Sequence, residues 1–235
     1  MSNTASILSL GGPLPSVQYI GGNIDFTQNG GGLNLDLSSI DIQSGDLIIG
    51  VHAVGEDSNL LSSMNIASTG YTLIASLFGS DTYDVNLEVY AKIADGTETL
   101  FTTSAGLLST SSVFAIARVY RGPSSIPTGG PGLYVADTAN NTDDITWPTV
   151  IGTKTGDMLV YIGATEHVSA VDSDYTNSSD LTDFVSDSAS DSEDITVGIG
   201  NKAITSESSF SASDWNMEGN TSSSAVAYVI LKLSV

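Results

Sequence analysis

The chain has 235 residues, and its 6 Lys and Arg face 27 Asp and Glu, which gives a formal net charge of −21 and a pI near 4.1. This balance argues against binding nucleic acid or an anionic membrane through a basic face. The absence of cysteine excludes disulfides and thiolate metal sites. The low charged fraction of 14% and the 24 glycines are typical of strands and turns rather than of helix surfaces.

Residues 1–15 end in Gly11-Gly12-Pro13-Leu14-Pro15 and predict an extended arm outside the core. The arm is either a flexible terminus or an anchor strand that docks on a neighbouring subunit. It has no basic segment followed by a long apolar run, so we expect no signal peptide and synthesis in the cytoplasm. No apolar run approaches the ~20 residues of a membrane span, which predicts no membrane insertion.

After the arm, strand-like runs recur about every ten residues with turn residues between them, as in a sandwich or barrel. Asp95-Gly96 lies between two such runs and predicts a hairpin. The runs expected in the first half are Val17–Ile20, Leu33–Leu37, Asp46–Val54, Tyr71–Phe78, Val85–Ala94, Thr99–Thr103 and Val113–Arg121.

Alternation predicts how two of these strands are exposed. In 85–93 the odd positions are apolar, and the even positions Asn86, Glu88, Tyr90 and Lys92 predict a face in water. The run 113–121 is apolar on both sides, with Arg118 as the interruption. It is either a central strand covered on both faces or a strand whose second face contacts a partner chain. The candidate partner-contact residues are Phe114, Ile116 and Tyr120.

The first half is repeated in the second. Gly45-Asp46, the run from Val85 and the run from Val113 match Gly156-Asp157, the run from Ile195 and the run from Ala225, at offsets of 111, 110 and 112 residues. The strands expected in the second half are Leu133–Asp137, Asp144–Trp147, Asp157–Ala164, Leu181–Val185, Asp194–Ala203, Ser208–Ala212 and Ser223–Leu233.

These patterns predict an all-β protein, an antiparallel, jelly-roll-like β-sandwich built from two tandem repeats. The expected organisation is an N-terminal arm (1–15), a first repeat (16–122), a connection rich in Gly and Pro (123–132) and a second repeat (133–235). We expect both repeats to form one sandwich.

An acidic segment interrupts the second repeat. It is either a solvated flank or a Ca²⁺ site, because hard cations prefer carboxylate oxygens. Asp172-Ser173-Asp174 begins like a Ca²⁺ loop but lacks the glycine and the terminal Glu, so whether a metal binds stays open. The acidic residues are Asp172, Asp174, Asp180, Asp183, Asp187, Asp191, Glu193 and Asp194.

No residue set predicts catalysis. His52 and His167 are the only histidines, and the chain has no Gly-x-Ser-x-Gly turn. We therefore expect a protein that is not an enzyme, with no catalytic residues and no organic cofactor. Trp147 and Trp215 are candidates for stacking on sugars. The alternative is that Trp147, next to Pro148 at a strand end, closes the edge of the sandwich.

Four motifs carry a resemblance: Gly45–Ile49, Gly70–Ile74, Tyr90–Glu98 and Val119–Gly122. Together with Gly156-Asp157, they make residues 40–233 similar to two-repeat β-sandwich structural proteins of tailed bacteriophages. The resemblance implies a capsid decoration or knob-like protein on the virion surface. Its partners would be other capsid or tail proteins, with homo-oligomer formation expected. Binding would use an apolar sheet face or the arm. The alternative is a tail-associated adhesin or lectin-like module that binds host-surface glycan.

Overall fold

The computed structural model describes residues 16–27, 30–104, 111–123, 125–128, 132–140, 144–167, 174–176, 180–189, 194–217 and 224–235. These residues contain strands and no helix. The strands of the first half are β1 (Gln18–Thr27), β2 (Asn34–Asp36), β3 (Leu47–Gly55), β4 (Thr72–Gly79), β5 (Val85–Ile93), β6 (Leu100–Thr102) and β7 (Ser112–Arg121). Those of the second half are β8 (Leu133–Asn140), β9 (Val150–Ile151), β10 (Met158–His167), β11 (Thr182–Ala189), β12 (Asp194–Ala203), β13 (Ser209–Phe210) and β14 (Ala225–Leu233).

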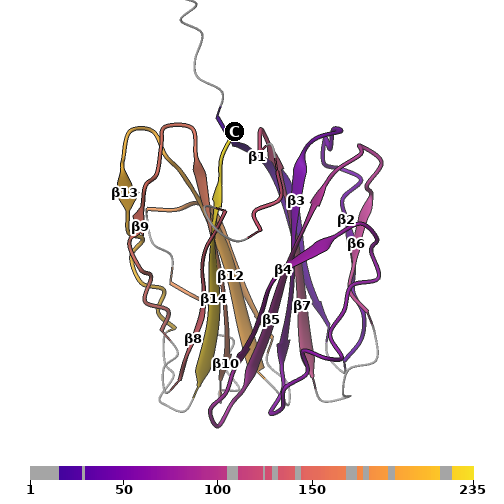
Figure 1. Ribbon diagram of the computed structural model, residues 1–235. Helices are drawn as coiled ribbons and strands as arrows, with labels where there is room; N and C mark the ends of the chain where they lie inside the picture. Colours follow the sequence, from indigo (N-terminus) through magenta and orange to yellow (C-terminus); the bar gives the residue numbers. More distant parts are fainter. Residues whose placement is uncertain are drawn as a thin grey trace, which may run out of the picture.

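The two halves have the same topology. The first forms an antiparallel sheet in the order β1-β7-β3-β5-β4, with β2 paired to β6. The second forms a sheet in the order β8-β14-β10-β12-β11, with β9 paired to β13. Figure 1 shows the two sheets as neighbouring layers, one indigo to magenta and the other orange to yellow. The prediction of an all-β sandwich from two similar halves is confirmed, and the chain completes one sheet before it begins the other.

Equivalent hydrogen bonds show the duplication at one turn in each half. Gly45 and Gly156 have φ values of 96° and 97°, a conformation that glycine adopts without strain. Gln43 N donates to Asp46 Oδ2 at 2.8 Å, and Lys154 N donates to Asp157 Oδ2 at 2.9 Å. The carboxylate after the glycine therefore closes the turn in both halves, which explains why Gly-Asp opens each repeat.

The main core lies between the sheets. The inward side chains of both layers form one buried cluster, which includes Val51, Leu87, Phe114, Val160 and Val229. Burying such a side chain completely stabilises a fold by roughly 1.5–3 kcal/mol. The sheets are also joined by hydrogen bonds near both ends of the strands. Val17 N donates to Gly156 O at 2.9 Å, and Glu56 N donates to Glu166 Oε2 at 2.7 Å.

Each sheet is also covered on its outer face, which the sequence patterns did not predict for β5. Leu60 and Met64, together with Phe101 of β6, pack against the outer face of the first sheet. Glu88 and Tyr90 are 3% and 7% exposed beneath this layer, so the prediction that they face water is wrong. A covering layer contributed by a distant loop leaves no trace in strand alternation.

The hairpin predicted at Asp95-Gly96 does not form. The strand after it, β6, pairs with β2 in the covering layer rather than with β5. Gly96 has a φ of 92° and directs the chain out of the first sheet. The turn was placed correctly, but the partner of the next strand depends on tertiary contacts.

Candidate functional site

The residues proposed to contact a partner are internal. Phe114, Ile116 and Tyr120 lie on the face of β7 that packs against the second sheet, and all three are buried. Tyr120 Oη donates to Asn201 Oδ1 of β12 at 2.8 Å. The prediction of a docking face is therefore wrong, because β7 lies between β1 and β3 with both faces covered.

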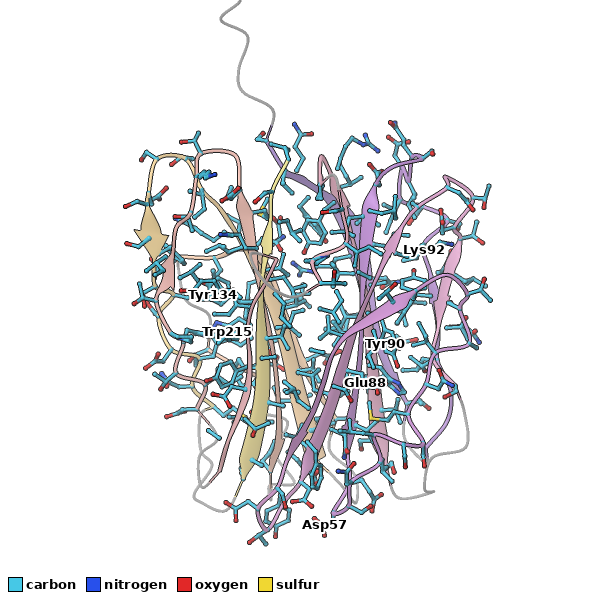
Figure 2. All side chains as sticks on the ribbon, in the orientation of Figure 1. Asp57, Glu88, Tyr90, Lys92, Tyr134 and Trp215 are labelled. Carbon is cyan, nitrogen blue, oxygen red and sulfur yellow. The ribbon has the colours of Figure 1, made fainter. Side chains whose placement is uncertain are left out.

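The two tryptophans are also enclosed. Trp147 and Trp215 have ring centroids 4.7 Å apart at 76°, and both are buried against the outer face of the second sheet. Glycines provide the space, since a Cβ at Gly198 would lie 2.9 Å from the Trp215 ring. Neither indole presents a free face, so the prediction of a sugar-stacking platform is wrong. Figure 2 shows Trp215 inside the second half.

Part of the acidic segment lies outside the described residues, namely Asp172, Asp191 and Glu193. Within the described ranges, no three His, Asp or Glu side chains are grouped so that they could hold a metal ion. The Ca²⁺ hypothesis therefore gains no support from the described acidic residues Asp174, Asp180, Asp183, Asp187 and Asp194.

A buried polar group on β5 was missed by the sequence reasoning. Tyr90 Oη donates to Glu88 Oε2, and Ser76 Oγ lies 3.4 Å from Glu88 Oε1. Burial raises the pKa of Glu88, and these two hydrogen bonds oppose the rise. Tyr90 and Glu88 are labelled side by side in Figure 2.

His52 lies directly opposite Glu88 in the β3–β5 pairing. Burial lowers the pKa of His52 to about 4, so the imidazole is neutral at pH 7. Neither ring nitrogen hydrogen-bonds within the described part of the chain. A hydrolytic site requires a nucleophile bonded to its base. His52 does not bond to Ser76, so these residues do not form such a chain.

The molecule has two chemically different ends. Ser16 and Val235 lie together at one of them, which we call the terminal end, because a Cβ on Gly122 would lie 3.1 Å from Ser16 O and 3.2 Å from Val235 Cγ1. Figure 1 shows the C-terminus beside the start of β1 at the top. Five of the six cations lie at this end, in the last two residues of strands or in the adjoining turns. The sixth, Arg118, lies in β7 three residues before Arg121 and therefore further from this end. The five are Lys92, Arg121, Lys154, Lys202 and Lys232.

Ion pairs at the terminal end fix the turns. Arg121 reaches both carboxylate oxygens of Asp46 at 2.9 Å, a bidentate contact, and approaches Asp41 Oδ2 at 3.5 Å. Burial opposes ionisation of Asp46, but the Arg121 guanidinium outweighs it and lowers the pKa of the carboxyl. In the second half, Ser234 Oγ donates to Asp157 Oδ1 at 2.7 Å in the equivalent place.

A hollow of about 350 Å³ opens at the terminal end beside the place where the arm joins the sandwich. Ser16 and Val17 form one side, and the Gly156-Asp157 turn and Ile204 form the other. Residues that precede Ser16 are therefore attached beside a concave surface.

The opposite end, which we call the acidic end, holds Glu56, Asp57, Asp84, Glu166 and Asp194 and no Lys or Arg, because all six cations are placed elsewhere. Burial raises the pKa of Asp57, and the negative charges of Asp84 and Glu56 add to the rise. In Figure 2, Asp57 is labelled at the bottom of the first half and Lys92 in its upper part.

No family model, no curated protein and no solved structure matches the chain. Among the described residues there is no helix of the length and apolarity needed to cross a membrane.

Proposed function

We propose that this protein is a non-enzymatic structural module displayed on the surface of a particle, as the resemblance to bacteriophage sandwich proteins implies. It is held at its terminal end through the arm, residues 1–15, and it directs its acidic end outward. The observation that carries this proposal is the polarity of the molecule, in which Ser16, Val235 and five of the six cations gather at one end.

The covered sheets support attachment through an end. The central strands of each five-stranded sheet, such as β3, β7, β10 and β14, are packed against protein on both faces, so their apolar faces are not available for docking. Exposed apolar side chains on the sheets are confined to scattered positions such as Phe26 of β1 and Leu73 of β4. The terminal end offers the hollow beside Ser16, and it holds five of the six cations of the chain, of which Arg121, Lys92 and Lys202 are paired with carboxylates of the same end. Contact with other capsid or tail proteins at this end leaves the acidic end, with the exposed carboxylate of Asp57, in solvent.

Deletion of residues 1–15 tests the proposal. The truncated chain is expected to keep its far-UV circular dichroism spectrum and cooperative unfolding, because the core begins at Val17. It is expected to lose co-sedimentation with purified particles, measured by quantitative mass spectrometry of the pellet. The matched control is Asp57→Asn at the acidic end, which is expected to bind like the wild type.

Two results would contradict the proposal. One is the absence of the full-length chain from purified particles. The other is equal binding of the truncated and full-length chains.

A further inference from the structure

Arg118 is the one charged residue on the inner face of β7, and it is 2% exposed. Its Nη2 donates to the backbone carbonyl oxygens of Asp183 and Ile199, the latter at 3.3 Å. The Tyr19 ring lies 5.0 Å from the guanidinium carbon, close enough for a cation–π contact. Arg118 therefore reaches from the first sheet to β11 and β12 of the second.

No carboxylate of the described residues lies within ion-pair distance of Arg118, although the charge of Asp183 acts on the same two tyrosines as the guanidinium does, Tyr19 and Tyr120. No ion pair of the described residues includes Arg118, and its Nη1 has no hydrogen-bond acceptor among them. The nearby Asp183 carboxylate is instead 3.4 Å from Asn201 Nδ2. A buried charge that no carboxylate contacts directly destabilises a fold. A purely structural role therefore does not account for the buried charge of Arg118.

Arg118 lines a pocket of about 100 Å³ between the edge strands β1 and β11. Its walls are apolar, from Ile24, Ile116, Val185 and Ile199, and Tyr19 and Asn23 add polar groups. Gly22 keeps the space next to Arg118 free, because a Cβ there would lie 2.9 Å from Arg118 Cγ and 3.1 Å from Tyr19 Oη.

The second repeat serves as an internal comparison. Arg118 pairs with Ile49 and with Gly22, and in the equivalent strands Leu231 pairs with Val160 and with Leu133. The counterparts of Arg118 and Gly22 are therefore both leucine, and Leu231 is buried in the same core. The strand pairing does not require an arginine beside a glycine.

We propose that the Arg118 pocket binds a carboxylate carried on a short aliphatic group. A guanidinium matches a carboxylate through two parallel hydrogen bonds, and the isoleucine and valine walls suit a few methylene groups. One cation in a strongly acidic protein neutralises a monoanion better than a dianion such as phosphate. The carboxylate belongs either to a free short-chain acid or to an acidic side chain or C-terminus of a peptide. The site is independent of the role proposed above.

The test uses the full chain, n-butyrate and a short peptide ending in Val with a free C-terminal carboxylate. Binding is measured by NMR chemical-shift perturbation, with butyramide and the amidated peptide as neutral controls. At least one of the two carboxylates is expected to shift resonances of Tyr19 and Ile199, and its neutral control is not. Response to butyrate identifies a small acid as sufficient, and response to the peptide alone identifies a peptide ligand.

Two variants separate binding from folding. Arg118→Leu copies the second repeat and is expected to fold with at least wild-type thermal stability, because it removes a buried unpaired charge. Its affinity is expected to fall by at least about tenfold, the factor for loss of one charge-assisted hydrogen bond. Val185→Trp, at a position 38% exposed on the pocket wall, is expected to block entry while Arg118 remains.

The proposal is overturned if neither carboxylate binds the wild type at tens of millimolar. It is also overturned if Arg118→Leu binds the carboxylate as tightly as the wild type does. If Arg118→Leu does not fold, the same result for folded Val185→Trp overturns it.

Discussion

Glu98 and Glu207 occupy equivalent places in the two halves. Each accepts backbone hydrogen bonds in the loop after the long strand and pairs with a lysine near the end of that strand, Lys92 at 2.8 Å and Lys202 at 3.7 Å. Burial opposes ionisation of Glu98, but Lys92 and the N–H groups of Asp95 and Gly96 hold its pKa at about 2. Single carboxylates thus fix the loops at the terminal end.

The pH dependence of stability follows from these low pKa values. A carboxyl with a pKa of about 2 when folded and 4.5 otherwise stabilises the fold above pH 4.5, and this contribution disappears as the pH falls from 4.5 towards 2. We expect Glu98→Gln to lower the free energy of unfolding at pH 7 by ~1.5–3 kcal/mol, the scale of hydrogen bonds to a charged group. Its stability should also vary less over this acid range, measured by urea denaturation.

Glu207→Gln is the matched control for this prediction. Backbone N–H groups of Ser206 and Thr205 hold the pKa of Glu207 at about 2, but its carboxylate is more exposed than that of Glu98. The loss for Glu207→Gln should be smaller. Equal losses, or none for Glu98→Gln, would show that the ion pair does not decide loop stability.

Glycines in the strands make room for bulky side chains of the layers that cover each sheet. A Cβ on Gly50 of β3 would lie 2.3 Å from Phe101 of β6, and one on Gly163 of β10 would lie 2.3 Å from Ile145. Glycine here provides room rather than an unusual backbone conformation. These contacts let the covering layers pack closely against the sheets.

We expect Gly50→Ala to destabilise the protein by about 1–3 kcal/mol, because overpacking displaces Phe101 and the layer around it. Urea denaturation measures the change. In a Phe101→Leu background the cost should be smaller, since the contacting ring is gone, and a double-mutant cycle gives the coupling. An equal cost in both backgrounds would mean that the clash with Phe101 is not the cause.

The whole molecule is stabilised by a core that neither sheet completes alone. The inner faces of both sheets supply the buried cluster, including Leu87, Phe114, Val160 and Ile199. Separation of the halves would expose this entire apolar surface to water. The two repeats are therefore expected to fold as one cooperative unit.

Expression of residues 16–122 and 133–235 as separate chains tests this expectation. Each chain alone should lack a cooperative unfolding transition, and mixing the two should restore one together with a heterodimer on size-exclusion chromatography. Cooperative unfolding of either half alone as a monomer would contradict the shared-core account.

The sequence by itself determined the all-β class, the duplication and most strand positions, because these depend on local alternation and turn residues. The pairing of β7 with β3 and of β14 with β10 shifts the alignment of the two repeats by one residue, because Val113 corresponds to Val226 rather than to Ala225. The interruption at Arg118 was visible in the sequence, but its meaning required knowledge of which residues face it from the second sheet.

Only the tertiary structure decided what each face contacts. Phe114, Trp147 and Glu88 are buried because layers from distant parts of the chain cover them, and a strand pattern records apolar character without identifying the cover. The gathering of cations at the terminal end likewise arises from the direction in which each strand runs. Burial and the placement of charge depend on long-range packing, whereas the sequence pattern reports local geometry.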